Sequence, residues 1–207
     1  MANLKDIRER IKSVKSIKQV TKAMKMVAAA KMRRAQENME KARPYSEKIS
    51  DLVDTFLLDE QNHELPEVKV RDNINKVLFV IITSDRGMAG AFNANVLKTA
   101  HKAIDQFGKE NAQLICIGKK SATYFKSRGY NIVLDYIDFW NTLSFDVGLS
   151  VAEDVISRYM NKEVDRVQVI YNKFINVAKQ EVCDEIFLPI TPSENTEADT
   201  SQISDMI

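Results

Sequence analysis

Acidic residues are missing from one stretch near the start of the chain, although the chain as a whole is close to neutral. No Asp or Glu occurs at residues 10–36, and nine of these 27 positions are Lys or Arg. Residues 1–50 hold 14 Lys/Arg against 5 Asp/Glu, whereas residues 51–207 hold 16 against 24. Net charges of +9 and −8 thus underlie the overall +1. This asymmetry indicates an electrostatic partner for the basic segment.

Cysteines and long apolar runs are also scarce. Cys116 and Cys183 are the only cysteines, and both lie in apolar runs without metal-ligand spacing. We therefore expect two buried thiols in a reducing compartment. The longest apolar run, Val77–Ile82, is far shorter than the roughly 20 residues of a membrane-spanning helix. The first twenty residues lack the apolar core of a signal peptide, so we expect any membrane to be reached through a partner.

Residue patterns of catalytic and metal sites are missing as well. His63 and His101 stand far apart and in no ligand or triad pattern, so we expect both at the surface. Asp135 and Asp138 could form a pair of carboxylates, but a solvated loop explains them equally well. We therefore expect no catalytic residue, no cofactor and no metal.

The segment SDRGMAGAFN raises the separate question of a phosphate-binding loop, because it follows an apolar run and precedes a helical pattern. Gly87 and Gly90 fit neither of the two common glycine spacings of such loops, and no lysine follows at the required place. The sequence therefore favours a structural turn, which we expect Asp85 to cap.

Glycine does not occur before Gly87, and apolar residues recur at helical spacing through the first 58 positions. Asn3 followed by Asp6 resembles a capping box that opens a helix at Leu4, and Pro44 should kink this helix or mark a join. A helix over residues 4–58 would be roughly 80 Å long, so most of it must project from the rest of the protein. A projecting helix with an apolar seam is unstable alone, so we expect another helix in its seam. The seam consists of Leu4, Ile7, Ile11, Val14, Ile17, Ala28, Met32 and Ala35.

The later part of the chain alternates strand and helix patterns. Buried strands are predicted at residues 77–83, in AQLICIG and in YNIVLDY, with helices at 93–107, in KKSATYFKSRG and at 142–159. Two longer strands, DRVQVIYNKF and KQEVCDEIFLP, should form an antiparallel edge. The prediction is an α/β class protein: a shaft helix at 1–58, a connector at 59–75, and a mostly parallel α/β sandwich of about five strands at 76–190. Residues 191–207 are acidic and expected to be disordered.

Four motifs together resemble the gamma subunit of the F-type ATP synthase. They are LKDIRERIKSVKSIKQVTKAMKMVAAAKMRRAQ, ARPYSEKI, ITSDRGMAGAFN and VIYNKFIN, in the order of the family. The resemblance implies a non-catalytic central-stalk rotor that couples ion flow to ATP synthesis, with the nucleotide sites in the surrounding ring. It implies the alpha and beta subunits of that ring, the epsilon subunit and the c-subunit ring as partners. It also implies a peripheral position at the cytoplasmic face of the bacterial plasma membrane, held only through the complex.

The resemblance also implies roles for individual residues. Those expected to face the lower collar of the ring are Lys15, Lys18, Lys22, Met24, Lys25, Lys31, Arg33 and Arg34. Arg43, Pro44 and Tyr45 would lie lower, toward the α/β foot. Met88, Ala89 and Ala91 replace the Leu, Cys and Gly that are commoner in the family. The family continues into a second long helix, antiparallel to the first, whereas this sequence ends at Ile207, so we expect a fragment of a longer subunit.

Nucleic-acid binding by a basic helix fused to an α/β domain is the alternative interpretation, because lysines neutralise phosphates. Arginine usually dominates recognition of phosphates and bases. Here only Arg33 and Arg34 are adjacent, and the lysines are spread around the helix. The match of motifs favours the rotor subunit and no nucleic-acid partner.

Overall fold

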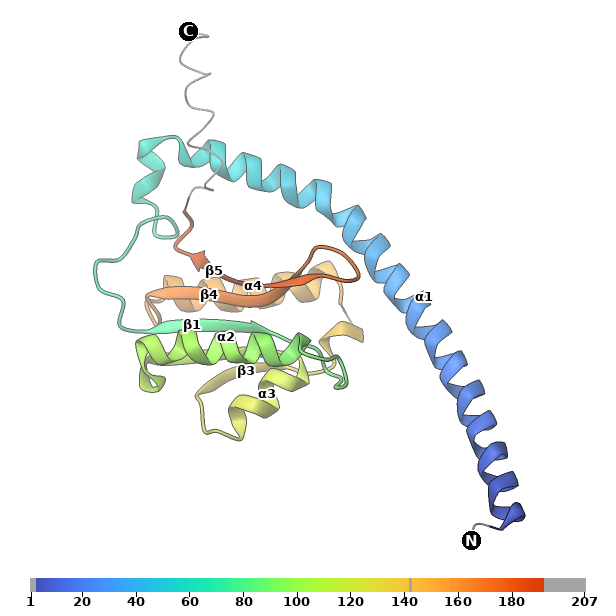
Figure 1. Ribbon diagram of the computed structural model, residues 1–207. Helices are drawn as coiled ribbons and strands as arrows, with labels where there is room; N and C mark the ends of the chain where they lie inside the picture. Colours follow the sequence, from blue (N-terminus) through green and yellow to red (C-terminus); the bar gives the residue numbers. More distant parts are fainter. Residues whose placement is uncertain (1–2, 142, 192–207) are drawn as a thin grey trace. The chain divides into compact units, whose positions relative to one another are not determined.

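The computed structural model describes residues 3–141 and 143–191, which divide into two compact units between Phe56 and Leu57. The first unit is formed by one helix of 54 residues, α1 (Leu4–Leu57), whose last residue already belongs to the second unit; α1 is drawn in blue and cyan in Figure 1. At its start, the Asn3 side chain accepts a hydrogen bond from the Lys5 N–H at 3.4 Å. Pro44 lies inside α1 without ending it, so the interpretation of Pro44 as a join between helices is wrong. The long helix expected from the apolar periodicity is confirmed.

The second unit is built around one five-stranded sheet with the order β3-β2-β1-β4-β5. Its strands are β1 (Val77–Ile82), β2 (Ala112–Ile117), β3 (Ile132–Tyr136), β4 (Arg166–Phe174) and β5 (Gln180–Leu188). The first four run parallel, and β5 pairs antiparallel with β4 at the edge. The mostly parallel sheet with an antiparallel edge is therefore confirmed. The chain moves from β1 outward to β3 and then returns to the other side of β1, so the strand order reverses between β1 and β4.

Helices cover both faces of this sheet, as Figure 1 shows. On one face, α2 (Phe92–Phe107) and α3 (Lys119–Lys126) bury Val96, Ile104 and Phe125 against the strands. On the other face, α4 (Phe145–Met160) buries Val151 and Val155. Because apolar side chains leave both faces of β1 into these two layers, its whole length reads as one continuous apolar run.

The ends of the helices follow local capping chemistry. The helix expected from residue 142 begins at Phe145, because the Ser144 hydroxyl oxygen accepts the Val147 N–H at 3.3 Å. Gly108 has a φ of 87° and donates its N–H to the Ile104 carbonyl, which ends α2. Short 3₁₀ turns lie at Glu60–Glu64, Lys109–Asn111 and Phe139–Asn141. The expected acidic tail lies, apart from its first residue, outside the described residues.

Candidate partner-binding surface

The apolar seam of α1 is uncovered. Within the described chain, the exposed fraction of Leu4, Ile7, Ile11, Val14, Ile17 and Met32 runs from 44% to 72%. Ala28 and Ala35 are exposed too. Fully burying one large apolar side chain is worth ~1.5–3 kcal/mol. A partner that covered several of these side chains would therefore gain a large part of its affinity from the seam.

Four of the basic residues of α1 lie together on one side of the helix. Lys15, Lys18, Lys22 and Lys25 are spaced 3, 4 and 3 residues apart in a continuous α-helix, so they fall within ~80° of arc. This basic stripe lies about a quarter-turn from the neighbouring seam residues Val14, Ile17 and Ala28, whereas the first seam residues, Leu4, Ile7 and Ile11, lie on the same side of the helix as the stripe. These four lysines gather on one side of α1, whereas Lys12 and Lys31 lie on other sides of it, so the lysines of the segment as a whole are still spread around the helix.

The basic stripe has no acidic neighbour along α1. No Asp or Glu stands three or four residues from any of its four lysines, and all four are exposed. The first acid beyond this region, Glu37, forms an ion pair with Arg33 at 2.9 Å. The positive charge of the stripe is therefore balanced only by solvent and salt, and it is available to an acidic surface.

The remaining residues singled out on α1 also lie on its surface. Met24 is 66% exposed, as is Tyr45. Arg43, Pro44 and Tyr45 continue the helix rather than forming a bend or loop of their own. Their expected place near the foot and the ring contacts of Met24, Lys31, Arg33 and Arg34 stay predictions.

The loop that joins β1 to α2 is held by side chains. The Ser84 N–H donates to Asn93 Oδ1 at 3.0 Å. Asp85 Oδ1 accepts the N–H of Lys119 at 2.8 Å and that of Asp138 at 3.3 Å, so it ties this loop to two later segments. The expectation that Asp85 caps its own turn is therefore wrong, and Ser84 with Asn93 takes that role.

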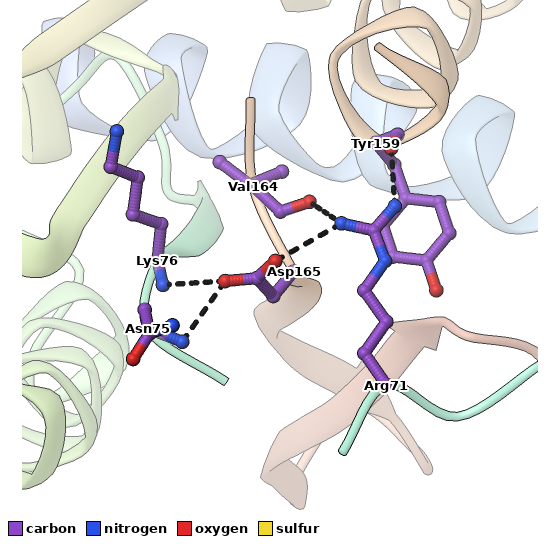
Figure 2. Close-up of polar contacts among 6 residues, drawn as sticks. All are labelled: Arg71, Asn75, Lys76, Tyr159, Val164 and Asp165. Atoms are coloured by element: carbon purple, nitrogen blue, oxygen red, sulfur yellow. Dashed lines mark hydrogen bonds and ion pairs between the residues drawn. The ribbon is translucent and has the colours of Figure 1, made fainter. Parts of the chain in front are cut away.

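A cluster of hydrogen bonds missed by sequence reasoning fixes the segment before β1, as Figure 2 shows. The Arg71 guanidinium donates to the carbonyl oxygens of Val164 and Tyr159, each at 2.7 Å, and pairs with Asp165 Oδ1 at 3.1 Å. It also lies over the Tyr159 ring, 4.2 Å from the ring centre. We call Arg71 and Asp165 the Arg71 clamp. No spacing in the sequence signals this contact, because the two residues are 94 positions apart.

The carboxylate of the Arg71 clamp is satisfied on both oxygens. Its Oδ2 accepts the backbone N–H groups of Asn75 and Lys76 at 2.9 and 3.0 Å. Burial on its own would raise the pKa of Asp165, but these two hydrogen bonds and the Arg71 guanidinium outweigh it and hold the pKa below its ordinary value. The clamp therefore fixes the entry of the chain into β1.

The other candidate side chains are scattered. His63 Nε2 donates a hydrogen bond to the Leu57 carbonyl oxygen at 2.7 Å, and half-buried His101 lies 3.2 Å from Asp105. Asp135 and Asp138 are both exposed. No group of three His, Cys, Asp or Glu among the described residues could hold a metal ion. In the same part of the chain, no helix is long and apolar enough to cross a membrane.

The two cysteines differ from each other. Cys116 is fully buried in β2, and burial raises the pKa of its thiol to about 12. Cys183 is only half-buried, so the expectation that both thiols are buried is wrong for this one. The reason is its place on β5, an edge strand whose side chains are covered only in part.

Comparison with known sequences matches nearly the whole chain. A sequence model of the family described as ATP synthase matches residues 3–207. The ATP synthase gamma chain of Chloroherpeton thalassium is 43% identical over 203 residues, covering 96% of this chain and 67% of the relative. The ATP synthase gamma chain of Prosthecochloris aestuarii is 45% identical over 197 residues, covering 93% and 68%. The chain thus spans about two thirds of the length of these relatives.

Solved structures show the same fold. A chain of the Tetrahymena thermophila mitochondrial ATP synthase, from a structure of its central stalk and c-ring, aligns with a TM-score of 0.62 at 22% identity, covering 90% of this chain and 86% of that one. A chain from the rotor of the Euglena gracilis mitochondrial ATP synthase aligns with a TM-score of 0.56 at 23% identity, covering 95% and 66%. With a long helix, a five-stranded α/β sheet and more than 40% identity to curated relatives, the chain belongs to the ATP synthase gamma chain family.

Proposed function

We propose that this chain is a central-stalk subunit of an F-type ATP synthase, in which α1 is part of the rotor shaft and the α/β unit is part of the foot. One observation carries the proposal beyond membership of the family. The 54-residue α1 presents an apolar seam and the basic stripe side by side, and neither is covered or neutralised by the described residues around it. A helix of this kind suits a protein that works inside an assembly.

The basic stripe is proposed to face an acidic collar formed by the alpha and beta subunits of the ring. A turning shaft must meet successive subunits without locking onto any of them. Exposed ion pairs are worth only ~0.2–1 kcal/mol each, whereas breaking a buried pair costs about 3–5 kcal/mol. Diffuse and solvated lysines therefore hold the shaft in the ring while leaving it free to turn.

The foot is proposed to bind the epsilon subunit and the c-subunit ring, with Arg43, Pro44 and Tyr45 nearest to it on the shaft. With these partners, the subunit is proposed to lie at the cytoplasmic face of the membrane, peripheral and held by the complex. The subunit itself is proposed to be non-catalytic. The loop after β1 supports this, because the N–H and the hydroxyl group of Ser84, at the start of the loop, are both bonded to the Asn93 side chain.

The test is assembly of a full-length gamma subunit with the ring of alpha and beta subunits, measured by binding at increasing salt. Reversal of Lys15, Lys18, Lys22 and Lys25 to Glu should weaken assembly at least tenfold, whereas Lys18→Ala alone should change it less than about fivefold. Salt should weaken the wild-type complex, because screening acts within ~10 Å at 0.1 M.

The matched control reverses four lysines of the α/β unit, Lys98, Lys102, Lys119 and Lys126, which changes the net charge by the same amount. This control should bind the ring as the wild type does. Equal loss in both quadruple variants would show a general charge effect and contradict the proposed role of the stripe. Unchanged assembly with a flat salt response would contradict it as well.

A further inference from the structure

A crevice opens at the carboxyl ends of β1 and β4, where the strand order reverses. Its volume is about 430 Å³. The residues that line it are Ile82, Thr83, Ser84, Phe92, Trp140, Tyr171 and Asn172. In open α/β sheets, ligands bind outside the carboxyl ends of the strands at the point where the order reverses. A mainly apolar hollow of the α/β unit thus coincides with the place that sheet topology favours for a ligand.

Hydrogen bonds to the main chain fix the walls of this crevice. Trp140 Nε1 donates to the Thr83 carbonyl oxygen at 3.0 Å, which holds the indole ring at the end of β1. Asn172 Nδ2 donates to the Phe92 carbonyl oxygen at 2.8 Å, which holds the start of α2 against β4. Because both walls are anchored to the sheet, the crevice is formed before any ligand arrives, and binding needs little rearrangement.

Two residues with strained backbone lie in the segments that border the crevice. Met88, in the loop before Phe92, has a φ of 59°, and Asp138, two residues before Trp140, has a φ of 60°. Side chains rarely adopt this conformation, and residues held in it are concentrated at functional sites. Asp85 connects the two segments through its hydrogen bond to the Asp138 N–H. Two of the three non-glycine residues with positive φ in the described chain thus border the crevice, and the third, Lys162, lies just after α4.

The chemistry of the lining selects a class of ligand. Three of the seven lining side chains are aromatic, none is charged, and the volume lies near the lower end of the roughly 300–1,000 Å³ range of small-molecule pockets. Asn172 uses its amide group on Phe92, and no donor among the described residues reaches its Oδ1. We propose that this crevice binds a neutral, planar aromatic molecule of one or two rings that carries one hydrogen-bond donor. Such a site is separate from the shaft surface and stands or falls independently of the proposed rotor function.

The test uses Trp140, the only tryptophan of the chain, whose indole N–H gives a single cross-peak in a ¹⁵N–¹H spectrum. The 207-residue chain is titrated with 2-naphthol, a two-ring neutral donor. The Trp140 peak should shift and saturate with a Kd below about 1 mM. Decahydro-2-naphthol has the same size but is not planar, and 2-naphthyl phosphate is charged, so each should bind at least about tenfold more weakly.

Two further comparisons test the walls and the acceptor. Phe92→Leu and Tyr171→Leu should each weaken 2-naphthol at least about fivefold, whereas Tyr171→Phe, which keeps the ring, should bind as the wild type does. In the wild type, the donor-free 2-methoxynaphthalene should bind about three- to tenfold more weakly than 2-naphthol. In Asn172→Ala, which lacks the acceptor, the two ligands should bind with equal affinity. A titration that does not saturate, or an equal response to 2-naphthol and its decahydro analogue, would overturn the proposal.

Discussion

Apolar side chains are buried in the α/β unit but exposed on the long helix. Val77, Leu78, Phe79 and Ile81 of β1 are fully buried between two layers of helices. Apolar residues at regular spacing on α1, such as Val14 and Ile17, remain about 60% exposed or more. The difference lies in the layers that cover each element rather than in the apolar content of either sequence.

This contrast reflects how the two kinds of backbone satisfy their hydrogen bonds. A strand such as β1 needs neighbours on both sides, here β2 and β4, and the sheet that they form brings covering helices with it. A helix makes its backbone hydrogen bonds internally, so α1 can form before anything covers its seam. The exposed apolar stripe of α1 therefore indicates a surface for a partner, whereas the apolar run of β1 indicates a strand in the buried core.

The largest effect is expected from Gly118→Ala in the α/β unit. Gly118 has a φ of 97°, and a Cβ there would lie 2.1 Å from the backbone oxygen of Thr83. The fold cannot accommodate this overlap without moving β1, so we expect a loss of more than about 4 kcal/mol in the free energy of unfolding. Urea denaturation followed by Trp140 fluorescence measures it.

Gly90→Ala is the matched control for this prediction. Gly90 also has a positive φ, of 56°, but no atom lies within 4 Å of the position of its Cβ. Only the backbone strain remains, at about 1–2 kcal/mol. Equal losses in the two variants would show that the close approach to Thr83 does not matter.

A second pair of variants compares the two units directly. Phe79→Ala removes a fully buried ring from β1 and should destabilise the α/β unit by about 3–5 kcal/mol. Met24→Ala removes a side chain of α1 that is 66% exposed and should change the same unfolding transition by less than about 0.5 kcal/mol. A large effect of Met24→Ala in the isolated chain would contradict this difference, because it would mean that Met24 is already buried.

A smaller effect is expected from Asp165→Asn in the Arg71 clamp. The pKa of Asp165 lies below its ordinary value in the folded state, so the carboxylate stabilises the fold above about pH 4 and loses this effect as the pH falls through the folded pKa. We expect Asp165→Asn to cost about 1–3 kcal/mol at pH 7 and progressively less at acid pH.

Glu163→Gln is the control for the clamp. Glu163 pairs with Arg158 at 3.0 Å, but its side chain is 45% exposed, so its loss should cost less than about 1 kcal/mol at pH 7. If Asp165→Asn left the pH dependence of stability below pH 4 unchanged, the proposed contribution of the clamp carboxylate would be wrong.

The elements of the fold could be predicted from the sequence because each has a local signal. The apolar run of β1 and the helical spacing of α1 depend only on neighbouring residues, and both matched closely. The partial exposure of Cys183 could not be predicted, because an apolar run does not distinguish a central strand from an edge strand. The spacing of Lys15, Lys18, Lys22 and Lys25 did hold the signal for a one-sided stripe.

The details of the sites depend on contacts between distant parts of the chain. The partners of Arg71 lie 88 to 94 positions away, and the bond from Asn172 to Phe92 spans 80 positions. Such contacts follow from the strand order, which no local pattern encodes. The crevice beside Trp140 likewise exists only once β1 and β4 are neighbours.

We infer that the α/β unit is complete without a partner, whereas α1 needs a partner to cover its seam. Hydrogen exchange of backbone amides, measured for the chain alone and after assembly into an ATP synthase complex, tests it most directly. In the isolated chain, amides of β1 should be strongly protected and those along α1 weakly protected, because no layer covers the helix. On assembly, α1 should gain protection while β1 stays the same. Strong protection of α1 in a dilute monomer, or no gain on assembly, would contradict the account.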